Sequence, residues 1–403
     1  MALTIYNRFF HPLHDIPGPL MCAISWLPWY KYWFSGHMHL EVLRLHETYG
    51  PVVRMGPSEV SFIDASTWKD IYSLKRCRQI ERCPKSFPAL TPHGAKFDLL
   101  TYSPSDHAKY RKILNPSFSE KATREYEPAI HRNTDKMISL LSTNLHGQDS
   151  RLNITKWFQW LTFDMVGDVV WGEPFDCIAE GRSHPCLALS MDLVSFSSFI
   201  VFIAWWTALK NFLIKLSGVE GMFIDMVRSK CEQNLESRSQ NASIFSNLTK
   251  EGTPLNAPEL DGNLSAIVIA GSETTGFVCT ATSFYLARNP ECFRKAAAEV
   301  RSAFSSENEI NDDALKKLPY LQATIEEALR MTPAEPNGLA RRVVIKGVEI
   351  GDRYIHKGVG YRASFLGQSQ ANTLRLQSTS PNSPPIATHH ISTFLTNTTL
   401  SDG

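Results

Sequence analysis

The segment NLSAIVIAGSETTGFVCTATSFYLAR, residues 263–288, decides the fold. It is apolar nearly all round, which predicts a helix buried in the middle of a large domain. The carboxylate of Glu273 and the hydroxyl of Thr274 nevertheless stand at its centre, and a buried carboxylate is costly unless it is paired or functional. Gly271 would let a large group approach the helix backbone. An alternative that the segment leaves open is that its serine and threonine side chains bond back to the preceding turn and kink the helix.

A second polar pattern is the pair Glu327 and Arg330 in the segment IEEALR. Residues three apart on a helix lie on one face, so the two side chains can form an ion pair. Such pairs are common on exposed helix faces, so this pattern is weak on its own. The predicted helix covers residues 318–330, and its buried face is marked by Leu321, Ile325 and Leu329.

The composition is that of a globular protein with a sizeable core. The chain has 403 residues, of which 43% are hydrophobic and 20% charged, and its formal net charge is +1. This balance gives no reason to expect a nucleic-acid partner. No stretch reaches the roughly 18 to 20 uninterrupted apolar residues of a membrane-spanning helix. The nearest candidate, residues 199–216, is either a core helix or a helix resting on a membrane surface.

The cysteines give no sign of a metal site. The chain contains eight, and no two of them form a CxxC pair, so a structural zinc site is not expected. Scattered cysteines in a chain of this length are more often buried free thiols than a disulfide framework. They are Cys22, Cys77, Cys83, Cys177, Cys186, Cys231, Cys279 and Cys292.

Three regions follow one another along the chain. Residues 1–40 are rich in proline and aromatic residues, which predicts an extended, packed segment. Residues 41–358 combine long helical periodicity with a predicted β-hairpin around Gly56-Pro57 and a short β pattern at residues 343–350. Residues 359–403 are dominated by Ser, Thr, Asn, Gln and Pro, so we expect a disordered tail. The predicted fold class is therefore mainly α with small β-sheets.

Two motifs in this order resemble the cytochrome P-450 family. AGSETT at residues 270–275 is similar to its oxygen-activating helix, and EALR at residues 327–330 is similar to its E-x-x-R helix. Further segments resemble the family's hinge, first hairpin, haem-facing helix and the strand after E-x-x-R: they are PGP (17–19), HETYGPVVRMGPSEVSF (46–62), DHAKYRKILNPSFS (106–119) and NGLARRV (337–343). YNRFFHPLHDIPGP is especially like fungal microsomal members that act in secondary metabolism. The resemblance covers about residues 6–358.

The resemblance implies a haem b cofactor and roles for residues of this chain. Glu273 and Thr274 would be catalytic, the first connecting to solvent and the second holding dioxygen and a relay water. A distortion of the helix at Ala270 and Gly271 would leave room for the oxygen. The residues that would lie against the cofactor are His107, Arg111, Ala270, Gly271 and Arg341. The aromatic residues expected to line a substrate channel or touch the membrane surface include Phe199, Phe202, Trp205 and Trp206.

The resemblance also implies a reaction and partners. The protein would be a haem-dependent, NADPH-linked monooxygenase that hydroxylates or oxidises a lipophilic small molecule, with a fungal terpenoid or polyketide as the family-level expectation. Electrons would come from an NADPH-cytochrome reductase. The implied location is the cytosolic face of the endoplasmic reticulum membrane. Residues 1–13 are too short and too polar for a complete membrane anchor, and we expect them to be the end of one.

The chain departs from the family pattern after Val359. The family continues with a PERF-like segment and the loop F-x-x-G-x-R-x-C-x-G, and neither follows here. With Cys292 the last cysteine, no residue can be the proximal thiolate at its family position. The structural pair Glu327 and Arg330 also lacks its third member, an arginine of the PERF-like segment. We therefore expect a P-450 fold that is incomplete at its C-terminus, truncated or frameshifted after about Val359. The alternative function is a catalytically dead, haem-free remnant.

Overall fold

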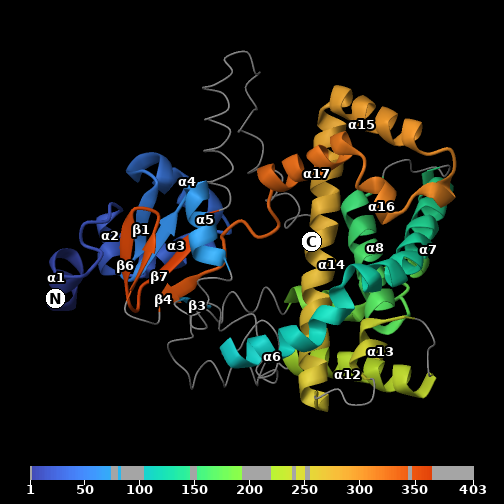
Figure 1. Cartoon of the computed structure of the whole chain (residues 1–403), viewed down its shortest axis with the longest axis horizontal. Helices are drawn as coiled ribbons and strands as arrows, with labels where there is room; N and C mark the ends of the chain where they lie inside the picture. Colours follow the sequence, from blue (N-terminus) through green and yellow to red (C-terminus); the bar gives the residue numbers. More distant parts are fainter. Residues whose placement is uncertain are drawn as a thin grey trace.

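The computed structural model describes residues 2–73, 80–82, 104–145, 152–192, 219–237, 242–249, 255–343 and 347–364. Figure 1 shows two lobes, with the N-terminal helices and the β-sheet at one side and the long helix α14 among the other helices at the opposite side. We call the described residues of 2–82 and 341–364 the sheet lobe, and those of 104–331 the helical lobe. The predicted class, mainly α with small sheets, is confirmed.

Short helices open the sheet lobe, so the prediction of an extended segment over residues 1–40 is wrong. They are α1 (Ala2–Phe9), α2 (Leu20–Ile24), α3 (Leu27–Phe34) and α4 (Met38–Tyr49). The reason lies in where the prolines fall. Pro19 is the N-cap of α2 and Pro28 lies in the first turn of α3, where a missing N–H costs no intrahelical hydrogen bond. These prolines therefore separate helices and do not prevent them.

Within the described residues, the β structure is a five-stranded sheet in the order β1-β2-β7-β4-β3 and a two-stranded sheet of β5 and β6. The strands are β1 (Val52–Gly56), β2 (Glu59–Phe62), β3 (Ile80–Arg82), β4 (Arg341–Val343), β5 (Gly347–Ile350), β6 (Arg353–His356) and β7 (Gly360–Ala363). The predicted hairpin is confirmed, because β1 and β2 pair antiparallel. Helix α5 (Ala65–Tyr72) packs on β5 and β7.

Strand β7 lies between β2 and β4, parallel to the first and antiparallel to the second. Its residues were expected to belong to the disordered tail, yet Tyr361 and Ala363 are fully buried in the core of the sheet lobe. The boundary expected after residue 358 therefore falls just before a strand of the folded sheet. Residues 365–403, the rest of the expected tail, lie outside the described residues.

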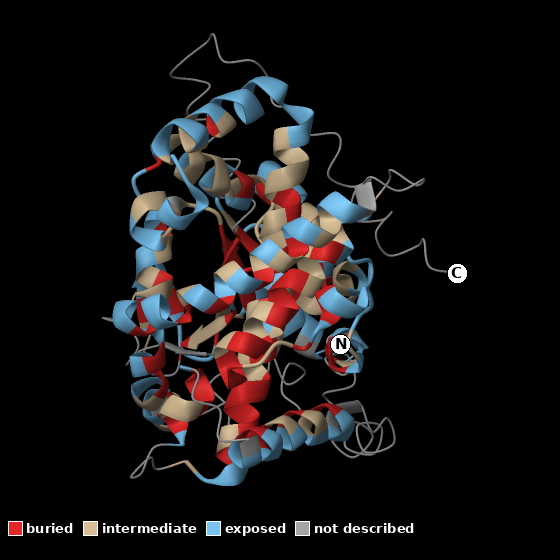
Figure 2. Cartoon of the chain, turned by 90° about the vertical axis from the view of Figure 1, so that its right-hand side faces the viewer, coloured by how far each residue is buried: buried red, intermediate tan, exposed pale blue. Residues whose placement is uncertain are grey.

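The helical lobe is built around α14 (Ala257–Arg288), which packs along α8 (Ile154–Trp171) and also contacts α12 (Val219–Ser237), α15 (Pro290–Ala303) and α17 (Pro319–Met331). Its other helices are α6 (Pro104–Leu114), α7 (Glu120–Leu145), α9 (Cys177–Glu180), α13 (Ile244–Leu248) and α16 (Asp312–Leu315), with 3-10 turns at Asn115–Phe118 and Glu307–Glu309. Figure 2 shows buried residues along much of the long central helix and exposed turns at the periphery. Among the described residues, α14 has the length and apolar composition to cross a membrane, and its place among the other helices is that of a core helix.

Candidate functional site

One face of α14 is closed by α8. Ser265, Val268, Ser272 and Gly276 recur at helical spacing and are buried. A Cβ added to Gly276 would lie 2.9 Å from Thr162 Oγ1 on α8, so glycine permits this close contact between the helices. The small and hydroxyl-bearing residues of the segment thus serve helix packing along this face.

The opposite face of α14 is open at its middle. Ala270 and Thr274, one turn apart, are exposed although the helix runs through the centre of the lobe. Gly271 lies at the edge of this face, and the group that approaches it is Val166 of α8, whose Cγ2 would lie 3.1 Å from an added Cβ. Gly271 thus permits close packing against α8 on this side, and an approach of the cofactor to it stays a prediction.

The hydroxyls on α14 bond back to the preceding turn, as the alternative interpretation of the segment predicted. Thr274 Oγ1 donates to the carbonyl of Ala270 at 2.6 Å, and Ser272 Oγ donates to that of Val268 at 2.8 Å. The helix is continuous from residue 257 to residue 288, so these hydroxyl bonds do not interrupt it, and the distortion expected at Ala270 and Gly271 stays a prediction.

Glu273 is the ionisable group beside this open face. The side chain is partly buried, and its Oε1 atom has no solvent exposure and no hydrogen-bond partner among the described residues. Burial raises the pKa of Glu273 above its ordinary value, because the carboxylate loses hydration that no donor replaces. The carboxyl can therefore hold a proton at a pH where an exposed glutamate has lost it, and Thr274 is the next residue along the helix.

Helix α6, which carries His107 and Arg111 one turn apart, is fastened to the start of α14. Lys109 Nζ lies 2.5 Å from Glu259 Oε1, and the Tyr110 hydroxyl donates to the same oxygen at 3.2 Å. Burial opposes ionisation of Glu259, but Lys109 and the other donors outweigh it and hold the pKa of this carboxyl below its ordinary value. His107 is half-buried and Arg111 is exposed.

Sequence reasoning missed Glu259, although a signal for it exists. Asn256 and Glu259 stand three apart and form a capping box, in which each side chain accepts a hydrogen bond from the backbone N–H of the other. That spacing predicts that α14 begins at Ala257, six residues before the apolar segment 263–288. The partner Lys109 is 150 residues away in sequence, and no local pattern points to it.

Arg341 lies in the other lobe, on β4. Its Nη1 donates to the carbonyl of Ala340 at 3.1 Å, and its guanidinium carbon lies 4.9 Å from the ring centre of Tyr72. The structure therefore places four of the predicted site residues on α14, namely Ala270, Gly271, Glu273 and Thr274. Helix α6 is bound to the start of that helix. Arg341 faces an aromatic ring of the sheet lobe.

The ion pair of Glu327 and Arg330 on α17 is confirmed but is not in the core. Arg330 donates from Nε and Nη2 to the two carboxylate oxygens of Glu327, both at 2.6 Å. The side chains are 24% exposed for Arg330 and 51% exposed for Glu327, so the pair lies at the surface of the helix. Leu329, which was expected on the buried face of α17, is 40% exposed. The neighbouring residue Ala328 is buried instead.

The N-terminus of α17 is held by α15. Both oxygens of Glu299 accept backbone hydrogen bonds there, from the N–H of Tyr320 at 3.0 Å and from that of Leu321 at 2.8 Å. Leu318, the N-cap residue, makes no side-chain bond, so Glu299 satisfies donors that the first turn leaves free. This contact anchors the first turn of α17 to α15, and α17 also packs against α14.

The described residues fit one side of a haem site and not the other. The open face at Ala270 and Thr274, with the protonatable Glu273 beside it, suits the side on which oxygen would bind. The other side needs a cysteine that can reach the iron as its thiolate ligand. Cys177, Cys186 and Cys231 are packed into the hydrophobic core of the helical lobe and Cys22 is buried in the sheet lobe, so none of the four lies at an accessible surface.

The remaining cysteines offer no clear ligand either. Cys279 lies on α14 itself, and burial raises its pKa. Cys292 is exposed near the start of α15. Cys77 and Cys83 lie outside the described residues, as do the expected channel residues Phe199, Phe202, Trp205 and Trp206. Among the described residues no group of three or more His, Cys, Asp or Glu side chains could hold a metal ion.

Comparison with known proteins agrees with the motifs. The family model for cytochrome P-450 matches residues 16–361. The cytochrome P-450 monooxygenase sdnF of Sordaria araneosa is 66% identical over 385 residues, which are 92% of this chain and 73% of that protein. The cytochrome P-450 monooxygenases atr2 of Stereocaulon alpinum and cpaH of Aspergillus oryzae are both 32% identical, over 88% and 92% of this chain and 71% and 74% of their own lengths.

Proposed function

The chain belongs to the cytochrome P-450 family of oxidoreductases, and on that basis we propose that it is a monooxygenase polypeptide that oxidises a lipophilic metabolite, such as a terpenoid or polyketide, in fungal secondary metabolism. The observation that supports the proposal best is the pairing of Glu273 with Thr274. A carboxyl whose pKa burial raises is followed in the chain by an exposed hydroxyl on the open side of a core helix. A carboxyl with a raised pKa is suited to deliver a proton to a reacting centre, directly or through one water.

The residues divide the proposed work as follows. Haem iron with a thiolate ligand supplies the oxygen-activating chemistry when it is bound. Glu273 would hold a proton at Oε1 and pass it towards the open face. The Thr274 hydroxyl donates to Ala270, which leaves its lone pairs free to accept that proton's hydrogen bond through water. His107, Arg111 and Arg341 are the basic side chains proposed to face the carboxylates of the cofactor.

A second candidate function has its own observation in favour. No described cysteine fits the proximal ligand, and the sequence has none after Cys292. We therefore propose that residues 1–403 alone form no thiolate-ligated haem, in which case this polypeptide is a haem-free remnant of a monooxygenase. The carbon-monoxide difference spectrum of the purified chain, after addition of hemin and reduction, tests this directly. A red-shifted Soret band typical of a thiolate ligand would contradict it, and Cys279→Ser and Cys292→Ser would then locate the ligand.

Deletion of the gene separates the two candidates. If the gene product is an active monooxygenase, the deletion strain should accumulate a nonpolar compound with one oxygen fewer than a product that it no longer makes. Comparison of nonpolar extracts by mass spectrometry detects the pair. An unchanged metabolite profile under conditions in which the gene is expressed would favour the remnant. Restoring the gene with Glu273→Gln tests whether the carboxyl contributes to the activity.

We also propose that the sheet lobe contacts a membrane, namely the cytosolic face of the endoplasmic reticulum, and that an NADPH-cytochrome reductase is the electron donor. The support for membrane contact is a set of exposed apolar side chains on α1, α2 and α3 and the turn after α1. They are Ile5, Tyr6, Phe9, Phe10, Leu20, Met21, Leu27 and Phe34. These helices contain no acidic residue, and Arg8 and Lys31 are basic. Apolar and aromatic side chains flanked by basic ones suit a lipid surface.

A further inference from the structure

Arg54 on β1 is a buried cation without a carboxylate partner among the described residues. The residue is 2% exposed. Its guanidinium donates only to backbone carbonyls: Nη1 to Asn7 at 2.9 Å and to Leu13 at 3.2 Å, Nη2 to Pro57 at 2.6 Å, and Nε to Gly56 at 3.4 Å. Burial lowers the pKa of Arg54, and the nearby Arg8 lowers it further. A buried charge is tolerated at such a cost only where its donors are satisfied.

Two of these carbonyls belong to the segment that precedes the sheet, residues 7–18. The backbone of Arg54 contacts the same segment, because its N–H donates to the carbonyl of Pro17 at 2.8 Å. Gly18 lies so close that an added Cβ would be 2.6 Å from the Arg54 carbonyl oxygen. The segment is thus bound to one residue at its start, its middle and its end.

The same segment connects to the exposed apolar helix α1. Asn7 and Leu13 are buried on the side of Arg54, whereas Phe9 and Phe10 are 61% and 71% exposed. Residues 7–18 therefore have a side fixed to the sheet and a side that presents aromatic rings to the surroundings. Because α1 also contacts α2, whose Leu20 and Met21 are exposed, the orientation of the whole apolar surface depends on this segment.

We propose that Arg54 is a positioning residue that clamps residues 7–18 to the sheet, so that α1 and α2 present their apolar side chains to a lipid surface in a fixed orientation. The lipid contact itself rests on the function proposed above, and the clamp does not. Five N–H donors in a planar fork let one arginine reach carbonyls of the segment and of the hairpin together. A lysine would place three donors at one point and could not reproduce this set.

Hydrogen exchange of the whole chain tests the clamp without any lipid. In Arg54→Met, peptides from residues 2–17 should exchange about tenfold faster than in the wild type, because the segment loses two side-chain hydrogen bonds and opens more often. Arg54→Lys should lie between the two. The matched control is Arg44→Met, which removes an exposed arginine paired with Glu41 on the adjoining helix α4 and should leave these peptides unchanged.

The exchange of α14 distinguishes a clamp from a general loss of the fold. Unchanged exchange in α14 with faster exchange in residues 2–17 supports the proposal. Equal protection of residues 2–17 in Arg54→Met and the wild type would overturn it. Faster exchange throughout the chain in both Arg54→Met and Arg54→Lys would also overturn it, because Arg54 would then support the whole fold and not one segment.

Flotation with vesicles of phosphatidylcholine and phosphatidylserine tests the orientation. Wild type and Arg44→Met should float with the vesicles, Arg54→Met should float less, and Phe9→Ser with Phe10→Ser should not float. Arg54→Met that floats as well as the wild type while its segment exchanges faster would contradict a fixed orientation. If the wild type does not float, the proposed lipid contact fails, and the exchange result alone decides whether Arg54 is a clamp.

Discussion

Buried charges are arranged differently in the two lobes. In the sheet lobe, Glu59 on β2 and Arg362 on β7 lie 2.6 Å apart, with side chains only 5% and 3% exposed. In the helical lobe, Arg132 and Asp168 lie 2.9 Å apart, but their side chains are 57% and 2% exposed. Two more buried acids of that lobe, Glu259 and Asp261, are also paired with half-exposed bases, whereas the fully buried Asp164 accepts hydrogen bonds from the backbone N–H groups of Cys177 and Ile178. In these ion pairs the sheet lobe therefore removes both charges from water, and the helical lobe removes one.

The difference shows how each lobe accommodates a buried charged side chain. A long basic side chain can pack its methylene groups against the protein while its charged end stays in water. A base on a helix surface can therefore pair with a buried acid and remain hydrated. A strand in the middle of a sheet offers no such route, and both partners must be enclosed. We expect the stability of the sheet lobe to be the more sensitive of the two to loss of either partner.

The largest effect is expected from Glu59→Ala. It leaves the Arg362 guanidinium buried beside the Trp29 ring, 5.8 Å from its centre, without its carboxylate. Breaking a buried pair costs about 3–5 kcal/mol of the free energy of unfolding, which chemical denaturation measures. The control is Glu59→Leu combined with Arg362→Leu, which removes both charges and should be far closer to the wild type. A single variant that loses under about 1 kcal/mol would erase the contrast between the lobes.

A second effect, confined to the sheet lobe, is a loss of stability in mild acid. His46 is buried, with Nδ1 donating to the Gly50 carbonyl at 2.9 Å and Nε2 accepting from the Ser61 hydroxyl at 2.8 Å. Burial lowers the pKa of His46 to about 4, although the bond to Gly50 opposes the change. His11 in the same lobe has a pKa of about 4, because of burial first and then of Arg54 and His356.

The sign follows from proton binding. In the unfolded chain these histidines take up a proton near pH 6.5, and in the folded chain they do so only near pH 4. The unfolded state therefore binds more protons between these values, and stability falls as the pH falls through that window. For His46 the loss should approach about 3 kcal/mol at pH 4. His46→Gln should flatten the profile of unfolding free energy between pH 7 and pH 4.5, and an equally steep profile would exclude His46 as its source.

A third prediction concerns an asymmetry within the helical lobe. Arg132→Ala should cost about 2 kcal/mol, because Asp168 stays buried with Asn133 as its remaining side-chain donor, at 3.0 Å. Asp168→Asn should cost less, about 1 kcal/mol, because the released Arg132 is hydrated and the amide still fits the site. Urea unfolding of the two variants gives the order. The reverse order would show that the exposed Arg132 contributes little to the free energy of unfolding. The two lobes would then differ less than the exposure of their side chains suggests.

The sequence could predict the parts of the fold that depend on local patterns, but not those that depend on residues far apart in the chain. The hairpin of β1 and β2, the helix α17 and the core helix α14 depend on local patterns of apolar residues and turns, and all three were predicted correctly. Strand β7 was missed because its order comes from pairing with β2 and β4, whereas the composition that follows it is polar. The ion pair between Glu59 and Arg362 joins residues some 300 positions apart, and periodicity carries no information on such a contact.

The candidate site was predictable to a similar extent. Glu273 and Thr274 were found because a carboxylate in an apolar helix is costly enough to need an explanation. The contact between Gly271 and Val166 of α8 could not be predicted, because the segment does not show which helix packs beside it. Glu259 was missed because its capping role is local but its ion pair with Lys109 is not.

A smaller effect is expected at α17. Glu327→Ala should change the free energy of unfolding by about 1 kcal/mol or less, because both partners of its pair reach solvent. A pair buried in the core would instead lose about 3–5 kcal/mol. Thermal unfolding of the purified chain distinguishes these values. A loss in the larger range would mean that Arg330 becomes buried in solution, and the surface position in the structure would then be wrong.

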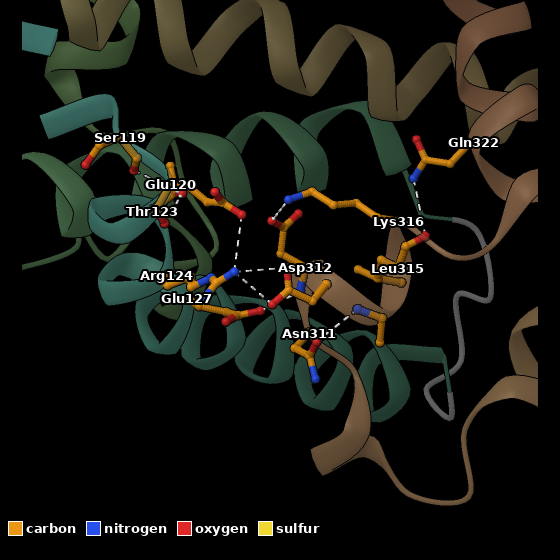
Figure 3. Close-up of polar contacts among 12 residues, drawn as sticks. Ser119, Glu120, Thr123, Arg124, Glu127, Asn311, Asp312, Leu315, Lys316 and Gln322 are labelled. Atoms are coloured by element: carbon orange, nitrogen blue, oxygen red, sulfur yellow. Dashed lines mark hydrogen bonds and ion pairs between the residues drawn. The ribbon is translucent and has the colours of Figure 1, made fainter. Parts of the chain in front are cut away.

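The smallest effect should come from the charged network between α7 and α16, where Figure 3 shows Arg124 between Glu120 and the segment around Asp312. Arg124 Nη2 lies 3.2 Å from Glu120 and 3.1 Å from Asp313, and all three side chains are more than half exposed. Exposed pairs are screened by salt and lose side-chain entropy, so Arg124→Ala should change the free energy of unfolding by less than about 0.5 kcal/mol, and that difference should vanish in high salt. The backbone bond from the Asp312 N–H to Glu127, at 2.7 Å, remains in this variant and keeps the two helices together. A loss above about 2 kcal/mol that persists in high salt would show that exposure does not decide the cost of a charge pair in this protein, which is the premise of the comparison between the lobes.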